Sequence, residues 1–120
     1  MDNKTIREQN DKFRKEMCLN GVCPSIPGKA VITLGASHWI ESGDANLRQL
    51  ELLTAIANFN DFTEDNDPYE EHDFGILEIE GETFNWKINY FDRDYQMGSE
   101  SPADLKVTRR VLTIMLSQEY

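Results

Sequence analysis

Basic side chains are scarce in this sequence of 120 residues: 12 Lys and Arg stand against 22 Asp and Glu, a formal net charge of −10. Proteins that bind nucleic acid generally need a surplus of Lys and Arg to neutralise phosphates. The same deficit disfavours docking on an anionic membrane. We therefore expect neither direct nucleic-acid binding nor membrane association.

Long apolar runs are also missing, and no stretch approaches the roughly 18 apolar residues of a membrane-spanning helix. Residues 1–17 lack the apolar region of a secretory signal peptide. Cysteine is rare, with only Cys18 and Cys23. Free thiols in the cytoplasm are the simplest interpretation, and a disulfide or a zinc site with further ligands is the alternative. The sequence thus predicts a cytoplasmic location.

Negative charge is concentrated in one part of the chain. Residues 1–60 carry seven basic and seven acidic side chains, whereas residues 61–104 carry 14 acidic and two basic ones. The densest stretch, residues 61–73, contains no Lys or Arg, and we call it the acidic segment. Its carboxylates are Asp61, Glu64, Asp65, Asp67, Glu70, Glu71 and Asp73.

Apolar spacing predicts helices over 3–17 and about 45–58, with a short β-branched strand over 29–35 between them. The acidic segment has no apolar period and contains a proline, so we expect an exposed loop. Strict alternation over 75–79 and 83–90 predicts a β-hairpin with a tight turn at Glu80-Gly81.

The last part of the sequence resembles the start of a helix. Ser101-Pro102-Ala103-Asp104 has a capping residue, a proline and an acidic residue in the expected order, and apolar residues from Val107 onward fall at helical spacing. The prediction is an α+β fold, one domain over 1–120 with an antiparallel hairpin or sheet packed against about three helices. The N-terminal helix, within 1–20, is the element expected at the periphery.

The sequence DNDPYEEHD at residues 65–73 combines carboxylates with a histidine, as divalent-cation sites do. It is not an EF-hand, because counting from Asp65 puts Glu70 at the position that requires glycine. A metal-dependent hydrolase or nuclease remains an alternative, with His72 and Asp73 as catalytic candidates. Its candidate metal ligands are Asp65, Asp67, His72 and Asp92. The simpler interpretation is a turn at Asp67-Pro68 surrounded by solvated charge, with no cofactor.

Three segments resemble a small bacterial family recorded as a domain of unknown function: FTEDNDPYEEHDFG, WKINYFDRDYQMGSESPAD and TRRVLTIMLSQEY. The resemblance runs from about Asn10 to Tyr120. Members occur in alphaproteobacteria and on plasmids and other mobile elements. Two departures stand out, since Glu70 replaces a glycine and Asn89 replaces an aspartate. The matching positions are Asp65, Asn66, Asp67, His72, Asp73, Phe74, Gly75, Trp86, Lys87, Tyr90, Asp92 and Arg110.

Nucleophile-elbow and phosphate-binding glycine motifs are absent from the sequence. The leading hypothesis is therefore a non-enzymatic interaction protein that uses the carboxylates of the acidic segment. Its expected partner is a basic, nucleic-acid-binding protein or complex, since carboxylates on a rigid element can take the place of phosphates. The mobile-element association implies an inhibitor of a host defence nuclease, of the anti-CRISPR or anti-restriction type.

Overall fold

The computed structural model describes residues 3–120, which form an α+β domain with three α-helices and a four-stranded mixed sheet. None of the helices in this range is long and apolar enough to cross a membrane. In chain order the elements are α1 (Asn3–Asn20), β1 (Gly28–Ile32), α2 (Leu34–Glu41), α3 (Ala45–Ala57), β2 (Phe74–Ile79), β3 (Glu82–Phe91), β4 (Arg109–Leu116) and the 3₁₀ turn η1 (Ser117–Glu119).

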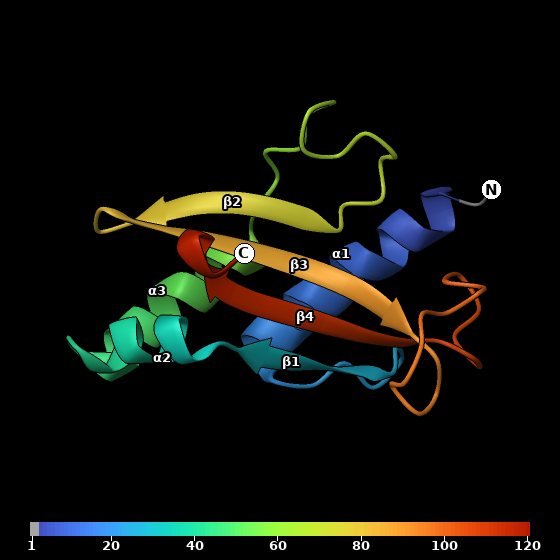
Figure 1. Ribbon diagram of the computed structural model, residues 1–120, viewed down its shortest axis with the longest axis horizontal. Coiled ribbons are helices and arrows are strands. Elements are labelled where there is room, and N and C mark those ends of the chain that lie inside the picture. Colours follow the sequence, from blue (N-terminus) through green and yellow to red (C-terminus); the bar gives the residue numbers. More distant parts are fainter. Residues whose placement is uncertain (1–2) are drawn as a thin grey trace.

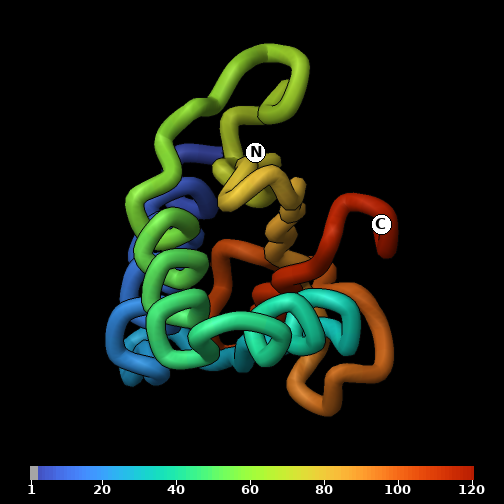
Figure 2. The backbone as a smooth tube through the Cα atoms, turned by 90° about the vertical axis from the view of Figure 1, so that its left-hand side faces the viewer, coloured from blue at the N-terminus to red at the C-terminus, as the bar shows by residue number. Residues whose placement is uncertain are grey.

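The strands lie in the order β1-β4-β3-β2, with β1 parallel to β4 and the other pairs antiparallel. Helices α1 and α3 lie side by side against one face of this sheet (Figures 1 and 2). The core forms where they meet the central strands, and Phe13, Leu52, Trp86 and Leu112 are fully buried there. The sheet edges are therefore β1 and β2, and the acidic segment leads directly into β2.

Several elements predicted from the sequence are confirmed. The helix predicted over 3–17 is α1, which continues to Asn20, and the helix predicted from residue 45 is α3. The hairpin joins β2 and β3 through the predicted turn, where Glu80 and Gly81 adopt positive φ angles of 52° and 80°. Alternation in β3 places Phe84 and Trp86 in the core, as the pattern indicates.

The helix predicted at the C-terminal end is wrong: residues 109–116 form strand β4. This strand lies between β1 and β3, and it is largely buried, with only Arg109 and Thr113 of its residues half-exposed. A strand buried on both faces has a nearly continuous apolar sequence, which also satisfies helical spacing. The β-branched residues Val111 and Ile114 are typical of strands, and the partners on both sides decide the outcome.

Helix α2 was not predicted, and strand β1 ends earlier than its pattern suggested. Thr33 begins α2, because its side-chain oxygen accepts a hydrogen bond from the Ala36 amide at 3.4 Å. Glu119 reinforces this start by accepting from the Gly35 amide at 3.0 Å and from the Thr33 hydroxyl at 2.6 Å. The C-terminal turn thus holds α2 in place, across more than 80 residues of sequence.

Candidate functional site

The acidic segment connects α3 to β2 and projects beyond the β2 edge of the sheet (Figure 1). Its seven carboxylate residues fall into two groups. Three turn inward: Asp67 is 5% exposed, and Glu71 and Asp73 are half-buried. The exposed residues, which we call the outer carboxylates, are Asp61, Glu64, Asp65 and Glu70.

Asp67 forms hydrogen bonds to the backbone of the loop that contains it. Its Oδ1 accepts hydrogen bonds from the amides of Glu71 at 2.9 Å and His72 at 3.0 Å. Its own amide donates to the Thr63 carbonyl at 2.8 Å, and its carbonyl accepts from the Glu70 amide at 3.1 Å. One buried carboxylate thus satisfies two loop amides that would otherwise lack an acceptor within the loop.

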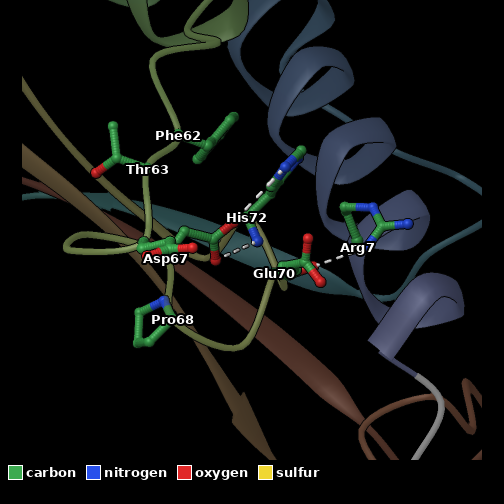
Figure 3. Close-up of a pocket in the computed structure, with 8 residues that line it drawn as sticks. Arg7, Phe62, Thr63, Asp67, Pro68, Glu70 and His72 are labelled. Atoms are coloured by element: carbon green, nitrogen blue, oxygen red, sulfur yellow. Dashed lines mark hydrogen bonds and ion pairs between the residues drawn. The ribbon is translucent and has the colours of Figure 1, made fainter.

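His72 joins this loop to α1. Its Nδ1 lies 2.9 Å from Oδ1 of Asp11. Its Nε2 lies 3.6 Å from Oδ2 of Asp67 (Figure 3). The imidazole also stacks on Phe62, with ring centroids 3.7 Å apart and an interplanar angle of 4°. Phe62 in turn meets Trp86 edge to face. The histidine is thus a link between the loop, the helix and the core.

Arg14 lies inside the protein, where it belongs to the same junction of the acidic segment, α1 and the core. This side chain is 1% exposed and donates to Asp11 at 3.1 Å, to the Ile56 carbonyl at 3.0 Å and to the Phe59 carbonyl at 3.2 Å. Its guanidinium lies 4.9 Å from the Trp86 ring centroid. Burial lowers the pKa of Arg14, and Asp11 opposes that effect. Asp11 therefore contacts a buried cation as well as His72.

One face of α1 binds the carbonyls of the acidic segment directly. The donors are spaced at i, i+4 and i+7, so they lie on one side of the helix. Each donor binds the backbone carbonyl of one of three consecutive loop residues. The bonds run from Asn3 Nδ2 to the Tyr69 carbonyl at 2.9 Å, from Arg7 Nη1 to that of Glu70 at 3.1 Å and from Asn10 Nδ2 to that of Glu71 at 2.9 Å.

A buried polar network continues from Glu71 into the sheet. The Tyr90 hydroxyl donates to Glu71 at 2.7 Å and accepts from Asn10 at 2.7 Å. The side chain of Arg110 is fully buried and donates to Asn10 at 2.7 Å and to Gln9 at 2.8 Å. Burial raises the pKa of Tyr90 and lowers that of Arg110. The inward carboxylate of Glu71 is thus bound within the protein.

Asp73, the last residue of the acidic segment, is also half-buried. Burial raises the pKa of its carboxyl above the usual value of 3.8, and the neighbouring Glu71 acts in the same direction. Lys87 on β3 partly opposes this shift. Asp73 carries its charge in less favourable surroundings than the outer carboxylates do.

A pocket of about 750 Å³ opens between α1 and the acidic segment (Figure 3). Two outer carboxylates, Glu64 and Glu70, belong to its wall, and Phe62 supplies an aromatic ring. The wall also includes the cationic side chain of Arg7, and the Phe62 ring is stacked on His72. The lining residues are Arg7, Phe62, Thr63, Glu64, Asp67, Pro68, Glu70 and His72.

The candidate metal ligands are only partly brought together. Asp67 and His72 are neighbours, whereas Asp65 is exposed. Asp92 caps its own turn, accepting from the amides of Asp94 at 3.2 Å and Gln96 at 3.0 Å. Across residues 3–120 no three His, Cys, Asp or Glu side chains form a group that could hold a metal ion. The carboxylates at the His72 ring come from Asp11 and Asp67, so the catalytic pairing of His72 with Asp73 finds no contact among the described residues.

The two departures from the resembled family pattern have different surroundings. Glu70 has φ of 55°, the left-handed conformation that glycine adopts most easily, so its backbone keeps the shape that a glycine would favour. Asn89 pairs with Val111 across the β3–β4 ladder, and it follows Ile88, whose amide donates to the Asp73 carbonyl at 2.8 Å. Only the change at Glu70 therefore adds a carboxylate to the acidic segment.

The α1 residues at this site were missed by the sequence analysis. Asn3, Arg7, Asn10, Asp11 and Arg14 follow the 3.6-residue period and form a polar stripe beside the apolar one. That polar stripe is the feature of the sequence from which these residues could have been identified. Two of its members, Asn10 and Arg14, are fully buried.

No curated protein and no solved structure matches the chain. A family described as "Protein of unknown function (DUF3768)" matches residues 31–119, which is most of the sequence and includes the whole acidic segment. The chain therefore belongs to the DUF3768 family.

Proposed function

We propose that this protein is a non-enzymatic interaction protein that binds a basic, nucleic-acid-binding partner through the outer carboxylates Asp61, Glu64, Asp65 and Glu70. The observation that carries the proposal is the anchoring of the loop. Three side chains of α1 bind its carbonyls, and His72 ties it to Asp11. Exposed charge on an anchored loop loses little conformational entropy on binding.

Negative charge on the outer carboxylates suits a partner that normally binds phosphates. The inward contacts of Asp67 and Glu71 anchor the backbone of the loop that carries the outer carboxylates. This anchoring supports a negative surface at a defined place on the protein. Such a surface accelerates encounter with a basic protein and weakens with added salt. The pocket beside Glu64 and Glu70 can receive one basic side chain of the partner.

The partner we propose is a bacterial host defence nuclease or nucleoprotein complex, which the protein inhibits by occupying its nucleic-acid channel in the cytoplasm. This part rests on the resemblance to proteins of alphaproteobacteria and mobile elements, because elements that enter a cell gain from blocking such nucleases. In this proposal the protein needs no cofactor and does not bind nucleic acid itself.

The experiment compares three forms of the full chain as bait in a bacterial lysate, at low and at high salt. The test variant combines Asp61→Asn, Glu64→Gln, Asp65→Asn and Glu70→Gln. The matched control changes four other exposed carboxylates by the same total charge: Glu8→Gln, Glu51→Gln, Glu78→Gln and Glu100→Gln.

We expect the unchanged protein and the control to capture a nucleic-acid-processing protein at low salt, and to inhibit its activity on nucleic acid. The test variant should do neither. Capture of no such partner at either salt concentration would overturn the proposal, and so would equal capture and inhibition by the test variant.

A further inference from the structure

Tyr69 is a large aromatic side chain exposed within the acidic segment. It lies in sequence between the outer carboxylates Asp65 and Glu70, and 69% of its surface is exposed. Within the described chain its ring forms no aromatic or cation contact, and its hydroxyl forms no hydrogen bond to another residue. The contacts that anchor the acidic segment therefore leave this side chain unused.

The backbone at Tyr69 is bound on both sides, although its side chain is exposed. Asn3 Nδ2 donates to the Tyr69 carbonyl at 2.9 Å, and Arg7 Nη1 donates to the Glu70 carbonyl at 3.1 Å. The Glu70 amide in turn donates to the Asp67 carbonyl at 3.1 Å. A tyrosine has few side-chain torsions, so ordering its ring on an anchored backbone costs little conformational entropy.

An exposed tyrosine beside carboxylates favours one kind of cation. Tyrosine is enriched among the residues that contribute most to binding at protein interfaces. The face of its ring attracts cations, as carboxylates do. A guanidinium is planar, so it can lie flat on a ring and donate to a carboxylate from its edge at the same time. The ammonium of lysine is a compact, strongly hydrated charge without this geometry.

The protein contains this combination at the turn between α2 and α3. The guanidinium of Arg48 lies over the Trp39 ring, 4.4 Å from the centroid. The same guanidinium lies 3.5 Å from the Glu80 carboxylate. One arginine thus contacts a ring and a carboxylate together, at a site where Glu80 is exposed.

A second example lies in the core, and the lysines differ from both. Arg14 lies 4.9 Å from the Trp86 ring centroid and donates to Asp11 at 3.1 Å. Lys29 and Lys87 also lie over aromatic rings, but neither forms an ion pair within the described chain. Of the described lysines and arginines, only arginines contact a ring and pair with a carboxylate at once.

We propose that Tyr69 binds an arginine side chain of the partner, whose guanidinium stacks on the ring and pairs with an outer carboxylate. This inference rests on the proposed function and specifies the chemistry of the partner at that surface. The outer carboxylates attract any basic protein, whereas the Tyr69 ring selects arginine over lysine.

The test uses two synthetic peptides of equal length, an oligo-arginine and an oligo-lysine, titrated into the full chain by calorimetry at low salt. Both peptides carry the same charge, so a difference in affinity does not come from net charge. We expect the arginine peptide to bind more tightly by roughly threefold or more, the scale of one exposed cation–π contact.

Substitutions at Tyr69 separate the ring from the charge. Tyr69→Ala should weaken binding of the arginine peptide by roughly threefold or more and change binding of the lysine peptide less. Tyr69→Phe keeps the ring and should keep the preference for arginine. Tyr120→Ala is the matched control, because Tyr120 is also 69% exposed and lies outside the acidic segment. Circular dichroism establishes that each variant is folded.

Equal affinity of the unchanged protein for the two peptides would overturn the inference. So would a Tyr69→Ala variant that loses no more affinity for the arginine peptide than Tyr120→Ala does. If both peptides bind equally and both need the outer carboxylates, this inference fails and the proposed function stands. If arginine is preferred through Tyr69 but a lysate yields no nucleic-acid-processing partner, the proposed function fails and the arginine preference stands.

Discussion

His72 and Asp11 are 61 residues apart in sequence, yet His72 Nδ1 lies 2.9 Å from one Asp11 carboxylate oxygen and 3.1 Å from the other. This contact fastens the acidic segment to α1. Asp11 also accepts from the buried Arg14, so one carboxylate serves both the loop and the core. The arrangement explains how a strongly charged loop holds a defined shape.

The first prediction concerns that shared carboxylate. Asp11→Asn should lower the free energy of unfolding by about 1–2 kcal/mol, because two hydrogen bonds to a charged acceptor are weakened. Chemical denaturation measures the change. Glu8→Gln is the control, since it removes one charge from an exposed position of the same helix and should change stability little. Equal stability of the Asp11 variant and the control would show that the junction contributes nothing.

The second prediction separates two aspartates that flank the same residue, Asn66. Asp67→Ala should cost about 1–3 kcal/mol, because two loop amides lose their acceptor within the protein. Asp65→Ala should change stability by less than about 0.5 kcal/mol, because Asp65 is exposed. Urea titrations of the two variants side by side make the comparison. Similar losses in both would contradict the division into inward and outer carboxylates.

The third prediction is a pH dependence. Burial raises the pKa of Asp73 above 3.8, so the folded protein holds this proton more tightly than the unfolded chain does. The stability that this proton provides is full below the unfolded-state pKa, and it is lost as pH rises through the folded-state pKa.

Asp73→Asn removes this penalty of ionisation. The variant should melt at a higher temperature than the unchanged protein at neutral pH, and the difference should vanish once the pH falls below 3.8, the ordinary value for this group. Thermal unfolding across that range tests it, with Glu78→Gln as an exposed control. A variant that melts at a lower temperature at neutral pH would show that the ionised carboxylate of Asp73 does not destabilise the folded protein.

The fourth prediction addresses the hydrolase alternative. A metal that binds only the folded state raises the melting midpoint. We expect the midpoint to be the same in EDTA, Mg²⁺, Mn²⁺ and Zn²⁺, because Asp65 is exposed and Asp92 caps a separate turn. A rise with one metal that His72→Ala abolishes would favour the alternative over the interaction function.

Much of the fold could be predicted from the sequence, and one exception is instructive. Local patterns were sufficient for α1, α3 and the hairpin, where the apolar period differs clearly between helix and strand. They were insufficient for β4. Residues such as Val111 and Ile114 fit both periods, and only pairing with β1 and β3, which are distant in sequence, selects the strand.

The sequence indicated which segment forms the candidate site, but not which of its side chains are buried and which are exposed. Asp65 and Asp67 are the same residue type in nearly the same local sequence, yet one is exposed and the other is buried. Asp67 is buried because it accepts from the amides of Glu71 and His72. The loop carbonyls at Tyr69, Glu70 and Glu71 are in turn bound by α1 side chains more than 60 residues away along the chain. Local sequence contains no information on that contact.

The central claim is that the outer carboxylates bind a basic partner, and isothermal titration calorimetry with the captured partner tests it most directly. The titration compares the unchanged protein, the variant of Asp61, Glu64, Asp65 and Glu70, and the control variant of four other exposed carboxylates, each at two salt concentrations. The account predicts at least about a tenfold loss of affinity for the first variant alone, a difference of about 1.4 kcal/mol, and a loss for the unchanged protein as salt rises. Equal affinity of all three proteins, or affinity that does not fall with salt, would contradict it.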